Sequence, residues 1–113
     1  MIITNILLNT NYIASITYNA GQIVMRLNGV QVQTGTLASS TGSNANNRLK
    51  IGFDIDPSSM QGRVRDIVIL PYAASLRQLQ LWEGFLSWKT ITNRWALNST
   101  HPFANRPPYT GDL

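Results

Sequence analysis

The sequence contains no cysteine, so neither disulfides nor thiolate metal sites can hold the fold together. Charged residues are also scarce, at 12% of the 113 residues, against a usual share of about a quarter. A surface with so few charges is poor at keeping copies of a protein apart. These absences indicate a fold that depends on packing or on partners, with a surface suited to contact with neighbouring subunits.

Long hydrophobic runs are missing too, because no segment approaches the ~20 consecutive apolar residues that a membrane-spanning helix needs. The N-terminal segment MIITNILLNTNY has no basic region, and polar residues interrupt its apolar run, unlike the pattern of a secretory signal peptide. We therefore expect no membrane partner and a protein made inside a cell.

The basic residues outnumber the acidic ones by nine to five, which gives a net charge of +4. A basic balance can indicate a nucleic-acid partner when the positive side chains gather in a patch. Here they are scattered along the whole chain, at Arg26, Arg48, Lys50, Arg63, Arg65, Arg77, Lys89, Arg94 and Arg106. This spacing argues against nucleic acid as a partner.

The first half of the chain carries the alternating pattern of β-strands. Residues 12–18 and 22–27 alternate larger apolar side chains with other residues, with a period of two. The Asn28-Gly29 pair then gives a strong hairpin signal, because both residue types tolerate positive φ. Residues 30–37 are the expected return strand.

Two further strands are predicted beyond this hairpin. Residues 48–54 alternate again, with Leu49, Ile51 and Phe53 expected to point inward. Residues 63–70 end in four consecutive apolar residues, which predicts a strand covered on both faces. The intervening segments 38–47 and 54–62 are rich in small and polar residues and are expected to be exposed loops.

A single helix is predicted over residues 75–91. Ser75 is a suitable N-cap, and the pattern places a wide apolar stripe on one helix face. The stripe consists of Leu76, Leu79, Trp82, Phe85 and Leu86, and we expect Trp82 and Phe85 to belong to the core. Gly84 interrupts the helix at a cost of up to about 1 kcal/mol relative to alanine, which is tolerable where another part of the chain approaches the backbone closely.

The sequence after residue 94 predicts an extended C-terminal tail. Its prolines, Pro102, Pro107 and Pro108, favour extended segments and local turns. Its aromatic residues predict a docked tail rather than a disordered one. The expected organisation is an N-terminal arm over residues 1–11, a reduced antiparallel β-sandwich over 12–94 that includes the helix, and the tail over 95–113.

Few residues offer catalytic or metal-binding chemistry. The five acidic residues include Asp54 and Asp56, whose carboxylates lie close in sequence, as a glycosidase or a calcium site would need in space. Two carboxylates on one turn are more typical of turn capping, and this loop lacks the spacing of an EF-hand. We expect no enzymatic activity and no metal or other cofactor.

His101 is the single histidine. Without cysteine or a second histidine it cannot build a zinc site or a familiar nucleophilic triad, so we favour a packing role for it. Tryptophans can stack on sugar rings, and among the three tryptophans Trp95 in the tail is the best candidate for such an exposed contact.

Two parts of the sequence resemble a known fold family. Residues 14–32, ASITYNAGQIVMRLNGVQV, resemble the central hairpin of laminin-G-like and concanavalin A-like jelly rolls. The segment 83–89, EGFLSWK, with HPFAN at 101–105 and the double proline at 107–108, is similar to the C-terminal signature of such domains in bacteriophage structural proteins. Those proteins carry Glu-Gly-Tyr-Leu-Ala-Trp-Lys and His-Pro-Tyr-Lys-Asn at the corresponding places. In them the His-Pro-aromatic motif is structural.

The resemblance implies a mainly β, jelly-roll-like sandwich with one C-terminal helix, but the chain holds only about half of the strands of that family. Asn98 also stands where the family usually has proline, and residues 104–106 lack the usual lysine. An incomplete sandwich leaves apolar surface and unpaired strand edges in water. Either the remaining strands close a smaller sandwich, or another subunit supplies the missing layer.

These observations together predict a non-enzymatic virion protein, namely a capsid decoration or cement protein that stabilises a phage shell assembled in the host cytoplasm. The expected partners are further copies of itself, with a trimer favoured, and the major capsid protein or another virion protein. The residues predicted to contact other copies or the capsid are apolar or aromatic: Ile2, Ile3, Ile6, Leu7, Leu8, Trp95, Phe103 and Tyr109.

The alternative is a carbohydrate-binding, lectin-like module of a phage tail or fibre, which the fold family also permits. The two loops over 38–47 and 54–62 would then form the binding rim. The residues predicted to contact a glycan are Asn44, Asn46, Asp54, Asp56 and Trp95.

Overall fold

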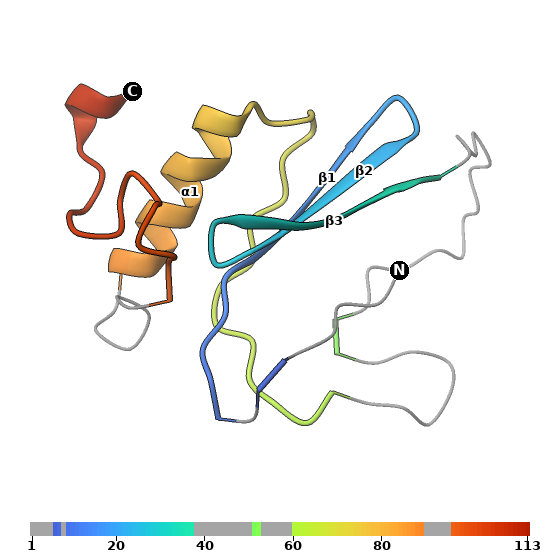
Figure 1. Ribbon diagram of the computed structural model, residues 1–113, viewed down its shortest axis with the longest axis horizontal. Helices are drawn as coiled ribbons and strands as arrows, with labels where there is room; N and C mark the ends of the chain where they lie inside the picture. Colours follow the sequence, from blue (N-terminus) through green and yellow to red (C-terminus); the bar gives the residue numbers. More distant parts are fainter. Residues whose placement is uncertain (1–5, 8, 38–50, 53–59, 90–95) are drawn as a thin grey trace. The chain divides into compact units, whose positions relative to one another are not determined.

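The computed structural model describes residues 6–7, 9–37, 51–52, 60–89 and 96–113 (Figure 1). The chain divides into two compact units, of which the first combines Met1–Ser39 with Leu70–Leu113 and the second is Ser40–Ile69. The strands and helices of the described residues all belong to the first unit.

The first unit contains a three-stranded antiparallel sheet in the order β1-β2-β3. Its strands are β1 (Ala14–Asn19), β2 (Gln22–Leu27) and β3 (Val30–Thr36). The three strands predicted for this part of the sequence are confirmed, within one or two residues at their ends. Both connections are tight hairpin turns, so each strand pairs with its neighbour in sequence.

Positive backbone dihedrals explain both turns. The φ angles are 48° at Ala20 and 88° at Gly21, and 52° at Asn28 and 83° at Gly29. Two consecutive positive φ angles characterise the type I′ turn, whose twist matches that of the flanking strands. Asn28 also exchanges hydrogen bonds with the main chain of Ile13, at 2.8 and 2.9 Å. The predicted Asn-Gly hairpin is therefore confirmed.

The two faces of the sheet differ sharply in polarity. The register pairs Ile16 with Met25 and Tyr18 with Ile23, so these large apolar side chains share one face. The opposite face carries the pair of Ser15 with Arg26. The register shifts between Met25 and Arg26 in the pairing of β2 with β3.

The helix α1 (Leu76–Trp88) begins as predicted at Ser75. The Ser75 side chain accepts a hydrogen bond from the Gln78 main-chain N–H at 3.2 Å, and the Gln78 side chain accepts one from the Ser75 N–H at 2.9 Å. This reciprocal pair is a capping box, which satisfies two helix-terminal donors. The helix ends at its C-cap Lys89, slightly before the predicted boundary of residue 91.

The buried face of α1 consists of Glu83, Gly84 and Ser87. Phe103 of the C-terminal segment lies against Gly84 and is completely buried, with an exposed fraction of 0%. Trp88 fixes the same segment, because its indole N–H donates a hydrogen bond of 2.7 Å to the Phe103 carbonyl. The close approach predicted at Gly84 is confirmed, and the tail is docked by it.

The small core of the first unit is made of residues distant in sequence, namely Ile13, Leu97 and Phe103. Leu81, Leu86 and Ala96 pack against it and are partly buried. The core therefore joins the approach to β1, the helix and the C-terminal segment (Figure 1). The C-terminal segment ends in the short 3-10 helix η2 (Thr110–Asp112).

The predicted placement of Trp82 and Phe85 in the core is wrong, whereas Leu86 of the same stripe packs against the core. Leu76, Trp82 and Phe85 are exposed, with Trp82 at 37% and Phe85 at 49%. The reason is steric, because a buried face made of glycine and serine admits the Phe103 ring, whereas the bulky stripe cannot. The helix consequently turns Gly84 and Ser87 inward and leaves Leu76, Trp82 and Phe85 exposed.

The predicted strand over residues 63–70 is also wrong, because this segment forms no ladder in the structure and Val64, Ile67 and Ile69 are exposed. Four consecutive apolar residues alone do not supply a strand with a partner for its main chain. The predicted strand 48–54 falls mostly outside the described residues; Ile51 and Gly52 within it form a bend.

The fold described here is a small globule with one three-stranded antiparallel sheet and one helix. The predicted C-terminal helix and the antiparallel strands are present. A second sheet that would complete a β-sandwich or jelly roll does not occur among the described residues.

Candidate functional site

Three charged or titratable side chains meet where the sheet, the helix and the C-terminal segment join. Arg26 on β2 binds Glu83 on α1 through two hydrogen bonds, from Nε to Oε1 at 2.7 Å and from Nη2 to Oε2 at 3.1 Å. His101 lies 2.8 Å from Glu83 Oε2 through its Nε2 atom. All three residues are buried. This polar cluster lies on the polar face of the sheet, and Ser15 reaches Glu83 at 3.5 Å.

The hydrogen bonds assign a tautomer to His101. The Phe103 main-chain N–H donates to Nδ1 at 3.1 Å, so Nδ1 is an acceptor and the proton resides on Nε2, which donates to Glu83. Arg26 additionally donates to the Gly29 carbonyl at 2.6 Å. Each ring nitrogen of the imidazole is engaged within the fold, so the cluster holds three segments together and fixes the turn that precedes Phe103.

A second ionic cluster closes the C-terminus. Arg106 donates to both carboxylate oxygens of Asp112, at 2.9 and 2.8 Å, and the Tyr109 main-chain N–H donates to the same carboxylate at 2.9 Å. Mainly because of the hydrogen bonds from Arg106, the pKa of Asp112 lies well below its usual range, and the Tyr109 N–H lowers it further. The Arg77 and Arg106 guanidinium groups also lie over the Phe103 ring, 5.2 and 5.0 Å from its centroid. This cluster fixes η2 beside the helix.

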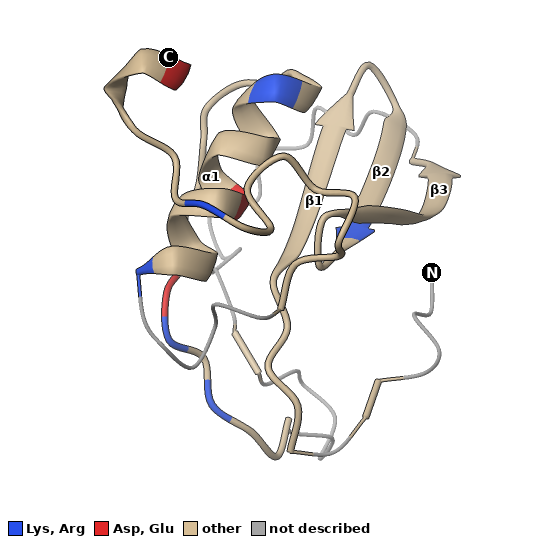
Figure 2. Cartoon of the chain, turned by 60° about the vertical axis from the view of Figure 1, so that its left-hand side comes forward, with Lys and Arg blue, Asp and Glu red and all other residues tan. Residues whose placement is uncertain are grey.

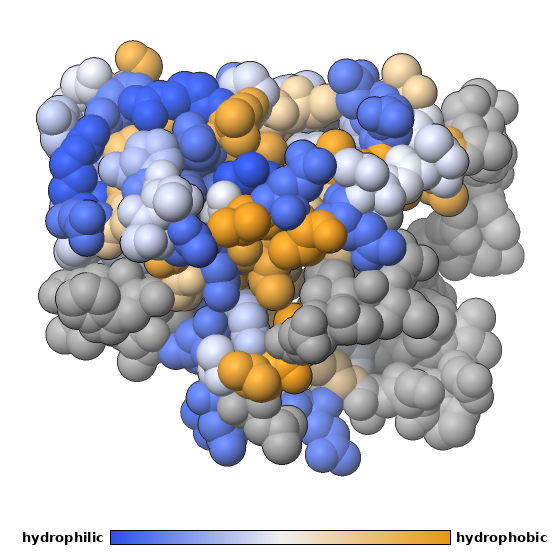
Figure 3. All heavy atoms as spheres, in the orientation of Figure 1, coloured by the Kyte–Doolittle hydropathy of each residue, from blue (hydrophilic) through white to orange (hydrophobic). Residues whose placement is uncertain are grey.

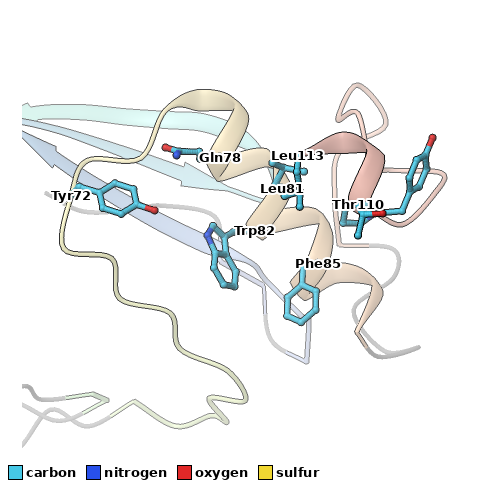
Figure 4. Close-up of a pocket in the computed structure, with 9 residues that line it drawn as sticks. Tyr72, Gln78, Leu81, Trp82, Phe85, Thr110 and Leu113 are labelled. Atoms are coloured by element: carbon cyan, nitrogen blue, oxygen red, sulfur yellow. The ribbon is translucent and has the colours of Figure 1, made fainter.

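An apolar groove of about 530 Å³ lies between the outward face of α1 and the C-terminal segment (Figure 4). Trp82 and Phe85 meet edge to face within it, with ring centroids 6.0 Å apart. None of the lining residues is charged in its side chain. They are Tyr72, Gln78, Leu81, Trp82, Phe85, Pro108, Tyr109, Thr110 and Leu113.

The apolar face of the sheet forms a second candidate surface. Ile16 is exposed to 64%, Tyr18 to 45% and Val30 to 40%. These side chains lie on the side of the sheet opposite to Arg26. Apolar side chains reach the surface in several places on the face shown in Figure 3, and charged residues occupy only short stretches of the ribbon in Figure 2.

The predicted contact residues are found in different environments. Ile6, Leu7 and Tyr109 are each more than half exposed, and Tyr109 lines the groove. The assignment of Phe103 as a contact residue is corrected, because this ring fills the space against Gly84 inside the unit. Four further predicted contact residues, Ile2, Ile3, Leu8 and Trp95, lie outside the described residues.

The predicted glycan-contact residues also lie outside the part of the chain that the structure describes. They are Asn44, Asn46, Asp54, Asp56 and Trp95. The structure therefore neither supports nor contradicts a shared site for these residues.

Two features of the site escaped the sequence analysis. The groove was missed because the helix stripe was assigned to the core, although Gly84 already indicated that another helix face was the packed one. The polar cluster was missed because its members are distant in sequence. Glu83 carried a signal for it, since an acidic residue amid the apolar residues of a helix needs a partner when buried.

No group of three or more His, Asp or Glu side chains that could hold a metal ion occurs among the described residues. Likewise, within the ranges that the structure describes, α1 and η2 are too short or too polar to cross a membrane.

Comparison with known proteins returned no relative. The sequence matches no protein family and no curated protein, and the fold matches no solved structure.

Proposed function

We propose that this protein is a non-enzymatic structural subunit of a bacteriophage virion, a decoration or cement protein that binds the shell as a homo-oligomer. The observation that carries the proposal is the open apolar face of the sheet, where Ile16, Tyr18 and Val30 are exposed. The sparse charge of the chain supports it, since little repulsion opposes contact between copies.

The energetics favour several contacts over one. Burying a large aliphatic side chain contributes about 1.5–3 kcal/mol, whereas association costs an estimated 4–15 kcal/mol in lost freedom of motion. Three or more side chains of the sheet face must therefore be covered together to hold a subunit in place. A trimer, in which each subunit meets two others, provides such coverage and is the state we favour.

The resemblance to jelly-roll proteins of phages suggests what the assembled copies would complete. A complete sandwich places a second layer on the apolar face of the first sheet. We propose that neighbouring chains supply this layer, either further copies or the major capsid protein of a particle assembled in the host cytoplasm.

The proposal is tested by measuring the mass of the purified chain by light scattering and by searching for the chain in purified phage particles. We expect an oligomer, and a fixed number of copies per particle. A monomer in solution that is also absent from particles would overturn the proposal.

A carbohydrate-binding module of a phage tail or fibre is the second candidate, because Tyr72, Trp82 and Tyr109 expose aromatic rings around the groove. Aromatic rings of this kind stack on sugars. Binding on a glycan array that Trp82→Ala or Trp95→Ala abolishes would support this candidate over the decoration protein.

A further inference from the structure

The chemistry of the groove restricts what can fill it. Aromatic and aliphatic side chains predominate in its lining, and its hydrogen-bonding side chains are limited to Gln78, Thr110, the Trp82 indole N–H and the hydroxyls of Tyr72 and Tyr109. The Gln78 side-chain oxygen is already used in the capping box at Ser75. A sugar, which carries a hydroxyl on most carbons, would lose hydrogen bonds to water without regaining them here. The groove is better suited to aliphatic side chains.

The N-terminal arm of the chain has the complementary chemistry. Residues 2–8, IITNILL, include five aliphatic side chains and none that is charged. The two arm residues that the structure describes, Ile6 and Leu7, are more than half exposed and do not line the groove. The Leu7 N–H donates to the Tyr12 hydroxyl at 2.9 Å, which ties this part of the arm to the approach to β1. Among the described residues, Ile6 and Leu7 of the arm and the lining of the groove are thus both open to solvent.

The arm is long enough to cross the groove. Seven extended residues span about 23–25 Å at ~3.3–3.6 Å each. The helix residues that line the groove run from Gln78 to Phe85, which corresponds to roughly 11 Å at 1.5 Å per residue. Part of an extended arm can therefore lie along this face of the helix, with its alternate side chains pointing into the groove.

We infer that the groove between α1 and the C-terminal segment receives the N-terminal arm, residues 2–8, of a second copy of this chain. This inference rests on the assembly of copies in the proposed function, and it names the segment that links them. Both surfaces lack charge, so neither has to lose the hydration of an ion when they meet. Exchange of arms between copies would bury Ile6 and Leu7 together with Trp82 and Phe85.

Because the chain has no cysteine, introduced cysteines give an unambiguous test. A chain carrying Leu7→Cys is mixed with a chain carrying Gln78→Cys, Phe85→Cys or Thr110→Cys, and the mixture is oxidised. We expect a disulfide-linked dimer of the two different chains with at least one of the three groove positions. The control partner carries Thr34→Cys on β3, which is exposed but outside the groove, and should give no more linkage than Leu7→Cys alone.

The double variant Leu7→Cys/Phe85→Cys distinguishes exchange from self-filling. Efficient linkage within one chain, with no linkage between chains, would show that the arm fills its own groove and would overturn the inference. A chain that is oligomeric by light scattering but gives no linkage at any of the three groove positions would overturn it as well, while leaving the proposed function standing. A chain that is monomeric would overturn both the inference and the assembly on which it rests.

A second measurement avoids cysteine altogether. Phe85→Asp places a charge in the groove and should weaken association between copies by about ten- to a hundredfold, with an unchanged circular dichroism spectrum because Phe85 is half exposed. Thr34→Asp is the matched control. Equal association of the two variants would contradict the inference.

Discussion

Gly84 is the residue of α1 against which the Phe103 side chain packs. A Cβ atom at this position would lie 2.7 Å from Cδ2 of the Phe103 ring and 2.8 Å from two further atoms of that side chain. Such distances are shorter than carbon atoms tolerate, and the ring has no free space to move into because it is fully buried. The glycine is therefore required by its surroundings, although glycine is a poor helix former.

We predict that Gly84→Ala destabilises the protein by about 1–3 kcal/mol, the usual cost of overpacking. In an exposed helix the same substitution would stabilise it by about 1 kcal/mol, so the sign of the change identifies the contact. Urea denaturation measures the difference. Gly62→Ala is the control, because a Cβ there would meet Met60 only at 3.6 Å or more; a stabilising effect of Gly84→Ala would show that Phe103 does not pack there.

Glu83 is the second residue for which the surroundings determine how a substitution changes stability. Its carboxylate is buried and receives hydrogen bonds from both Arg26 and His101. Removing the negative charge leaves a buried guanidinium without its counter-ion, which typically costs 3–5 kcal/mol. The cost arises from Arg26, which stays buried and charged after its partner has been removed.

We predict that Glu83→Gln lowers the free energy of unfolding by about 3–5 kcal/mol, measured by urea denaturation at pH 7. The double variant Arg26→Met/Glu83→Leu should be less destabilised than the single variant, because it removes both charges together. If the double variant were less stable than Glu83→Gln, the cluster would stabilise the fold by more than the pairing of its buried charges.

At the scale of elements, the start of α1 and the hairpins could be predicted because their signals are local. Ser75 and Gln78 form their capping box within four residues, and Asn28-Gly29 needs only its own dihedral angles. The orientation of α1 could not be predicted, because it is set by Phe103, which lies far along the chain. The large apolar side chains of the stripe predict a packed face, but the small residues Gly84 and Ser87 form it together with Glu83.

The candidate surfaces, too, could be predicted only where their signals are local in the sequence. The apolar character of the arm and of the helix stripe was evident from composition, while the groove exists only because Pro108, Tyr109 and Thr110 return to the helix. The polar cluster needs three segments to meet. The strand predicted over 63–70 failed because its apolar residues gave no information about a pairing partner.

The element η2 carries a dependence on pH through Asp112. The pKa of this carboxylate is lowered in the folded protein by hydrogen bonds from Arg106 and from the Tyr109 N–H, relative to an unfolded value of about 3.9. The unfolded chain therefore binds a proton more readily than the folded one below that value. The resulting stabilisation is fully present above about pH 4 and is lost as the pH falls through the lower folded pKa.

We predict that the stability difference between the wild type and Asp112→Asn is largest near neutral pH and shrinks below about pH 4. Urea denaturation at pH 7 and at about pH 2.5 measures it. Arg106→Gln should reproduce the effect, since it removes the main donor to the carboxylate. A difference that is the same at both pH values would exclude the carboxylate as its cause.

At the scale of the whole molecule, the sheet of the first unit is packed on its polar face and open on its apolar face. The helix meets the sheet on the side of Ser15 and Arg26, while Ile16 and Tyr18 occupy the uncovered side. Exposed apolar surface of this kind typically marks a contact with another protein.

We predict that Ile16→Lys reduces the oligomeric mass measured by light scattering and changes the free energy of unfolding by no more than about 0.5 kcal/mol, as is usual for exposed positions. Thr34→Lys, on β3, adds the same charge on the opposite face of the sheet and should leave the oligomer intact. An unchanged oligomer in Ile16→Lys would show that assembly uses another surface.

The burial of Arg26 by Glu83 and His101 has a consequence for biosynthesis. The strands β1, β2 and β3 are synthesised before Glu83 and His101, and at ~5–20 residues per second the interval between Arg26 and His101 lasts several seconds. Until then the Arg26 guanidinium on β2 lacks the partners that bury it in the finished fold. A nascent chain that stalls before Glu83 is added should therefore hold this arginine in water.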